Sequence, residues 1–93
     1  MARMAQWDDL LDSASAGDGV AAYELAMGYA SGSGGQTMDL VEAHRWFNVG
    51  VACGYAPAQA WRAEIAAEMS ARQVVDAQRL ARATLAGMMR QAA

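Results

Sequence analysis

The hydrophobic residues of this chain recur at three- and four-residue intervals, as expected when one face of a helix packs against a core. The clearest case is the segment 18–30, where apolar side chains fall at positions i, i+3, i+4 and i+7 from Ala22. The β-branched residues never form an alternating run of strand length. The periodicity predicts an all-α fold with helices at about residues 5–16, 18–30, 39–53 and 57–68, and a last helix that runs from about residue 70 almost to the carboxyl end.

Capping residues mark where these helices begin. Asp18 is placed to cap the second helix and Asp39 to cap the third. Ser70 and Gln73 have the spacing of a capping box, which predicts the start of the last helix. Pro57 suits the first turn of the fourth helix, because a missing backbone N–H costs nothing there.

At 93 residues the chain has room for one domain with a thin core. The apolar fraction is 55%, but much of it is alanine, which contributes helix propensity more than buried area. The predicted core therefore depends on the tyrosines, the scattered Leu, Val and Met residues, and the largest apolar side chains, Trp7, Trp46, Trp61 and Phe47. On the third helix the side chains predicted to face inward are Ala43, Trp46, Phe47 and Gly50, and those predicted to face solvent are Glu42, Arg45 and Asn48.

Two parts of the chain repeat each other. Ala16-Gly17-Asp18 recurs as Cys53-Gly54-Tyr55, and Ala21 recurs as Ala58, at a spacing of 37 residues (54 − 17). Helix pairs with such a period indicate an α-solenoid, in which each pair buries its apolar face against the next. The ordered small, aromatic and glycine positions of this region are Ala21–Tyr29, Gly32–Gly34, Asp39, Glu42–Ala43, Trp46–Phe47 and Gly54–Ala58.

On these residues the chain resembles the Sel-one-like repeats (SLR), relatives of the tetratricopeptide repeats, and the resemblance runs from about Leu10 to Ala60. The segment Met69–Arg82 is similar to the terminal helix that often closes short bacterial SLR proteins. Two positions depart from the family pattern: Gly35 stands where valine is usual, and Gly50 where alanine is usual. We expect a looser loop at Gly35 and a third helix weakened by about 1 kcal/mol at Gly50.

The resemblance implies a short α-α superhelix in a single domain. Residues 1–16 would form an N-terminal half-repeat, residues 18–54 the complete repeat, and residues 56–93 a second, closing helix pair. It also implies a non-catalytic adaptor that binds another protein in a bacterial cell. The first helix of each pair usually lines the groove of the family, which by position gives the contact residues Glu24, Met27, Gln59 and Arg62.

The last helix has a wider apolar face than its own fold requires. At about 100° per residue its apolar side chains fan across roughly 220°, about twice the stripe needed to dock on one neighbour. Val75, Leu80 and Met89 join the predicted contact residues for this reason. We expect a partner protein or a second copy of the chain to cover the excess, although isolated exposed apolar residues are common. An accessory subunit or a self-associating structural protein is therefore the alternative function.

The charge balance and the apolar runs weigh against other partners. The formal charge is −3 and the chain contains no lysine, so there is no general basic field to attract nucleic acid. No stretch approaches the roughly 20 apolar residues that span a bilayer, and none near the amino terminus reaches signal-peptide length. We expect a cytoplasmic protein, or a periplasmic one if a signal was removed. The single cysteine, Cys53, suits a reducing compartment.

Residues capable of catalysis or metal binding are scattered. The only histidine, His44, lies about two and a half turns from Cys53 and on the opposite side of the same predicted helix, so we expect it to be exposed or partly packed. The seven methionines are dispersed, and the glycine-rich loop 31–37 lacks the lysine of a phosphate-binding loop. The sequence therefore predicts no enzymatic activity, metal or cofactor. A small enzyme or metal carrier is the least favoured alternative.

Overall fold

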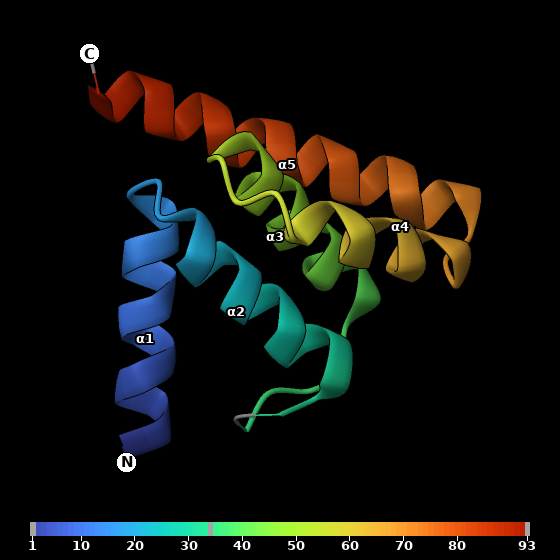
Figure 1. Ribbon diagram of the computed structural model, residues 1–93, viewed down its shortest axis with the longest axis horizontal. Coiled ribbons are helices and arrows are strands. Elements are labelled where there is room, and N and C mark those ends of the chain that lie inside the picture. The colour runs from blue at the N-terminus through green and yellow to red at the C-terminus, as the bar shows by residue number, and fades with distance from the viewer. Residues whose placement is uncertain (1, 34, 93) are drawn as a thin grey trace.

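A computed structural model describes residues 2–33 and 35–92 of the chain (Figure 1). This part is all-helical and contains no strand, which confirms the predicted fold class. The helices are α1 (Ala2–Ser15), α2 (Gly19–Ser31), α3 (Leu40–Ala52), α4 (Ala58–Ala67) and α5 (Ala71–Ala92).

Helix α3 lies at the centre of the arrangement and packs against α2, α4 and α5. Helix α1 packs mainly on α2, at the edge of the molecule seen at the left of Figure 1. Helix α5 is the longest element and crosses the top of the view, where it packs mainly on α3 rather than on α4. The last two helices of the chain, α4 and α5, therefore both pack on α3.

The predicted caps explain where the helices begin. The Asp18 carboxylate accepts hydrogen bonds from two backbone N–H groups in the first turn of α2, at 3.0 and 3.2 Å. Ser70 and Gln73 form the reciprocal capping box, with bonds of 2.9 and 3.1 Å. Asp39 caps α3 through the N–H of Glu42 at 3.1 Å. Each cap satisfies a helix donor that would otherwise lack a partner.

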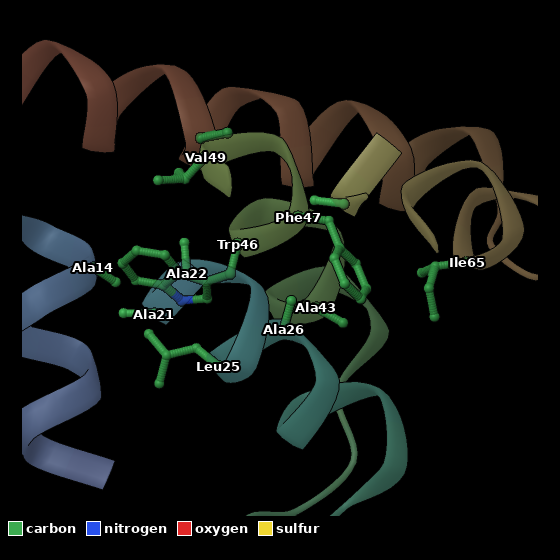
Figure 2. Close-up of a cluster of buried hydrophobic side chains, with 12 residues drawn as sticks. Ala14, Ala21, Ala22, Leu25, Ala26, Ala43, Trp46, Phe47, Val49 and Ile65 are labelled. Atoms are coloured by element: carbon green, nitrogen blue, oxygen red, sulfur yellow. The ribbon is translucent and has the colours of Figure 1, made fainter. Parts of the chain in front are cut away.

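The core lies between α2 and α3 and is closed by residues of α1, α4 and α5. Its largest fully buried side chains are Phe47, Leu25 and Val49. In Figure 2, Trp46 lies on the side of Ala14 from α1, whereas Phe47 lies on the side of Ile65 from α4. The buried alanines of the cluster allow the helices to approach closely, and they are Ala14, Ala21, Ala22, Ala26, Ala43, Ala58 and Ala81. The inward positions predicted for α3 are all buried.

The prediction that Trp61 belongs to the core is wrong. Its side chain is 41% exposed, and α4 turns Ala58 and Ile65 inward instead. Helix α4 packs substantially only on α3, so a residue at the edge of its inward stripe has no second neighbour to cover it.

The outward orientation predicted for Glu42, Arg45 and Asn48 is also wrong, because all three are partly covered. Arg45 donates hydrogen bonds to the Thr84 hydroxyl of α5 at 3.0 and 3.2 Å, and its guanidinium forms an ion pair with Glu42 at 3.0 Å. The physical reason is the central position of α3. A helix with three neighbours has little surface left for solvent.

Candidate binding surfaces

The residues predicted to contact a partner lie on several separate surfaces. Glu24 and Met27 line a groove between α1 and α2, whereas Arg62 lines a different hollow between α3, α4 and α5. Gln59 is exposed near the start of α4. Neither of these two hollows brings the residues of α2 and α4 together, so the single groove implied by the SLR resemblance stays a prediction.

The groove between α1 and α2 is mostly apolar and has a volume of about 340 Å³. The Trp7 ring stands edge-on to Tyr29, with ring centroids 5.1 Å apart and an interplanar angle of 81°. This arrangement resembles the preferred geometry of aromatic pairs. The full lining is Gln6, Trp7, Leu10, Tyr23, Glu24, Met27, Gly28 and Ser33.

The second hollow combines apolar walls with positive charge and has a volume of about 390 Å³. Its lining is Asn48, Val51 and Ala52 from α3, Arg62 from α4, and Gln78, Ala81, Arg82 and Leu85 from α5. Two of these residues are arginines and none is acidic. The hollow is therefore cationic although the whole chain carries a formal charge of −3.

A chain of hydrogen bonds leads from this hollow into the core. Arg62 donates through Nη1 to Oδ1 of Asn48 at 2.8 Å, and Nδ2 of Asn48 lies 3.0 Å from Nδ1 of His44. A guanidinium has donors only, so the Asn48 oxygen must face Arg62 and its NH2 group must face His44. Nδ1 of His44 therefore accepts, and the neutral ring carries its proton on Nε2.

The prediction that His44 is exposed or partly packed is wrong, since only 3% of the residue is accessible. Burial lowers the pKa of His44, and the nearby Arg62 charge lowers it further. Protonation would also place an N–H donor against the NH2 group of Asn48. His44 is thus held neutral, and in this form it fixes the orientation of Asn48 and through it that of Arg62.

Arg62 and Arg82 differ from Arg45, Arg72 and Arg79, which all form ion pairs within their own helices. Arg45 pairs with Glu42, and both Arg72 and Arg79 pair with Asp76 on their own helix. Among residues 6–33 and 35–91, whose side chains the structure describes, neither Arg62 nor Arg82 has a carboxylate partner. The two positive charges of the hollow are therefore available to a group from outside the chain.

The apolar face of α5 is covered at its centre and open at both edges. Ala77 and Ala81 are buried, while the exposed fractions of Val75, Leu80 and Met89 are 51%, 36% and 74%. Leu80 lies at one edge and Met89 at the other, about 180° apart around the helix. Val75 and Met89 share an edge but lie about 21 Å apart along the axis. These three residues do not form one compact patch.

Leu80 has a separate setting from the other two exposed residues of α5. It lines a further hollow, which has a volume of about 460 Å³. The other lining residues are Val41 of α3 and Arg72, Asp76 and Arg79 of α5. The charges around it are already joined in ion pairs. Leu80 is therefore the most enclosed of the three predicted contact residues on α5.

The polar network was not predicted, although the sequence holds a signal for it. At the repeat spacing of 37 residues (62 − 25), Arg62 stands where the first unit has Leu25, one of the largest fully buried side chains. A charged residue at a repeated core position requires a polar partner nearby. Asn48 supplies that partner and is itself bonded to His44. The i,i+4 spacing within α3 indicates the contact between His44 and Asn48, but it does not reveal that α4 brings Arg62 to them.

Comparison of the chain with protein-family models, with curated proteins and with solved structures gives no significant match. In the part of the chain that the structure describes, no three or more His, Cys, Asp or Glu residues gather in a way that could hold a metal ion. None of the described helices combines the length and the apolar character needed to cross a membrane.

Proposed function

We propose that this chain is a non-catalytic protein-binding module, a short tetratricopeptide-like adaptor of the SLR type. The observation that carries the proposal is the set of large apolar side chains left exposed on the last two helices. Trp61, Val75 and Met89 are 41%, 51% and 74% exposed. A partner that covers them would remove apolar surface from water, which is the main driving force of protein association.

The residue types at these positions support a protein partner. Tryptophan, methionine and arginine are enriched in protein interfaces, and tryptophan and arginine often contribute most of the binding energy. Trp61 and Met89 are exposed, and the hollow between α3, α4 and α5 contains two arginines. Methionine also adapts its shape to different partners. The bacterial and cytoplasmic setting belongs to the same proposal and rests on the SLR resemblance.

The alternative is a self-associating structural protein or an accessory subunit of a larger complex. Val75 and Met89 lie on one edge of the 22-residue helix α5, so two copies could pair along this edge. Sedimentation velocity from micromolar to millimolar concentration separates this alternative from the adaptor. An adaptor for another protein is expected to remain a monomer of 9.8 kDa over the whole range.

The proposal is tested by site-specific photo-crosslinking in the cells that make the protein. A photoreactive amino acid at position 89 should give an adduct with one distinct protein. The matched control is position 83, which is also exposed on α5 but lies about 160° from the buried Ala81 and so faces away from the packed side. Equal labelling from both positions, or none from position 89, would contradict the proposal, and an adduct between two copies would favour self-association.

Substitution gives an independent check on the same surface. Met89→Glu combined with Val75→Glu should abolish the adduct, because a carboxylate at each position opposes burial against an apolar partner surface. Both residues are exposed, so the helical content measured by circular dichroism should stay unchanged. An adduct that persists in the doubly substituted protein would show that this edge of α5 is not the interface.

A further inference from the structure

We infer that the hollow between α3, α4 and α5 binds a carboxylate side chain of the partner protein, an Asp or Glu that stands next to an apolar residue. The inference rests on the proposed protein-binding function and adds the chemistry that the partner must present. It follows from the residues that line the hollow, from the fixed position of one arginine, and from the absence of acidic residues in that lining.

The charge of the hollow is not balanced from within. Arg62 and Arg82 both line it, and no Asp or Glu does. Arg45, Arg72 and Arg79 instead form ion pairs with carboxylates of their own helices, Glu42 for the first and Asp76 for the other two. Two like charges facing one cavity repel each other, and an anion between them relieves the repulsion. The hollow is therefore complementary to negative charge.

Arg62 is held in place before any ligand arrives. Its Nη1 donates to Asn48 at 2.8 Å, and Asn48 is fixed in turn by His44 at 3.0 Å. A guanidinium has five N–H donors, so most remain for a ligand. Its planar fork matches a carboxylate with two parallel hydrogen bonds. Because Arg62 is partly buried and already oriented, binding loses less side-chain entropy than at a freely moving surface arginine.

The remaining walls define what accompanies the carboxylate. Val51, Ala52 and Leu85 present apolar surface beside the two arginines, and Gln78 adds an amide. An apolar side chain next to the acidic residue would cover Val51 and Leu85. The combination favours a peptide segment of a protein over a small inorganic anion, which would leave the apolar walls exposed.

Selection from a random peptide library tests this inference and does not require the identity of the partner. A phage-displayed library of random peptides is panned against the immobilised protein, and the selected peptides are sequenced. We expect enrichment of Asp or Glu beside a large apolar residue. Dissociation constants of one selected peptide are then measured by fluorescence anisotropy for the wild-type protein and its variants, at low and at high salt, since a charge-based contact weakens as salt rises.

Arg82→Gln should weaken binding about tenfold, and Arg62→Gln by more, because each removes charge-assisted hydrogen bonds. Arg62→Lys should recover only part of the loss, since lysine keeps the charge but not the fork. The matched control is Arg79→Gln, an exposed arginine of α5 paired with Asp76, which should change binding less than about twofold. Arg82 is exposed, so its substitution leaves the fold intact and keeps the test decisive even if Arg62→Gln unfolds the protein.

Failure of this inference can be separated from failure of the proposed function. Peptides that show no enrichment in acidic residues, or that bind Arg82→Gln as tightly as wild type, would overturn the carboxylate inference and leave the photo-crosslinking result at position 89 unaffected. A library that yields no peptide would also count against it. If position 89 gives no adduct while acidic peptides still require both arginines, the carboxylate inference is supported and the proposed interface on α5 is contradicted.

Discussion

The indole of Trp7 lies so close to Gly28 that a Cβ atom at position 28 would be 2.7 Å from Cζ3 of the ring. No real Cβ makes such a contact, so the missing side chain of Gly28 creates the space that the ring occupies. The same ring stands edge-on to Tyr29. Because α1 packs mainly on α2, this contact helps to hold α1 in place, together with the buried Ala14.

Gly28→Ala should therefore loosen α1. The methyl group forces the ring to move, at a cost of about 1–3 kcal/mol, which exceeds the gain of about 1 kcal/mol from better helix propensity. We expect a lower free energy of unfolding in urea and faster hydrogen exchange in α1. The matched control is Gly87→Ala in α5, where the nearest atom to the new Cβ is the end of Arg90 at 3.7 Å. Gly87→Ala should stabilise the protein by up to about 1 kcal/mol. The same gain from Gly28→Ala would show that the Trp7 ring does not occupy the space beside position 28.

Gly50 has a different role from the one its departure from the SLR pattern suggests. A Cβ there would lie 3.3 Å from the Cβ of Ala58 and 3.3 Å from the carbonyl oxygen of Gly19. The glycine thus permits α3 to approach the beginning of α2 and the beginning of α4 together. Backbone atoms cannot move aside as a flexible side chain can, so the position has little room for a methyl group.

Gly50→Ala should consequently fail to strengthen α3. We expect the gain of about 1 kcal/mol in helix propensity to be outweighed, with a net loss of roughly 1 kcal/mol in stability. Thermal unfolding followed by circular dichroism measures this directly, with Gly87→Ala again as the reference for an unobstructed helix position. A rise in Tm as large as that of Gly87→Ala would show that α2 and α4 yield to the methyl group.

The helix ends were predicted closely from the sequence. The predicted starts of α2 to α5 lie one residue before the observed ones, because Asp18, Asp39, Pro57 and Ser70 act at the boundary itself. Capping is a local effect, decided by a few neighbouring residues, so a single sequence is enough to locate it. The predicted start of α1 at residue 5 is later than the observed start at Ala2, where no capping residue marks the boundary.

The surroundings of individual side chains were predicted less well, since these depend on which helices meet. Helical periodicity places Asn48 and Arg45 away from Phe47, but it does not reveal that α4 and α5 both pack on α3. That arrangement turns an expected solvent face into an interface with polar contacts. It also leaves Trp61 exposed, because α4 has only one substantial neighbour. The sequence pattern shows which residues share one face of a helix, and the number of neighbouring helices decides whether that face is buried.

The contact between Arg45 and Thr84 joins α3 to α5 and should contribute to stability. The Thr84 hydroxyl accepts from Nε and Nη2 of Arg45 at 3.2 and 3.0 Å and donates to the Leu80 carbonyl at 2.9 Å. Thr84→Val keeps the shape and removes the acceptor, which should cost about 1 kcal/mol in the free energy of unfolding. Thr37→Val, at an exposed loop position, should change it by less than about 0.5 kcal/mol. Equal effects in urea unfolding would mean that water replaces the contact.

The buried His44 should make the protein less stable in mild acid. Burial, and then the charge of Arg62, lowers the pKa of His44 below its ordinary value of 6.5 in the folded chain. In the unfolded chain both influences are lost. Between the two pKa values the unfolded chain binds a proton that the folded chain does not, so stability falls as the pH drops from 6.5 toward the folded pKa. Above pH 6.5 this contribution is complete.

His44→Gln tests this linkage, because glutamine can accept a hydrogen bond but does not titrate. Urea unfolding of both proteins between pH 8 and pH 5, a range in which most carboxylates stay ionised, should give a free energy of unfolding that falls with acid for wild type and stays nearly level for the variant. Acid should also weaken the hold of Asn48 on Arg62, since a protonated Nδ1 cannot accept from the Asn48 amide. Parallel pH profiles in the two proteins would show that His44 takes up a proton in the folded chain as readily as in the unfolded one, and this result would contradict the hydrogen-bond directions assigned to the network.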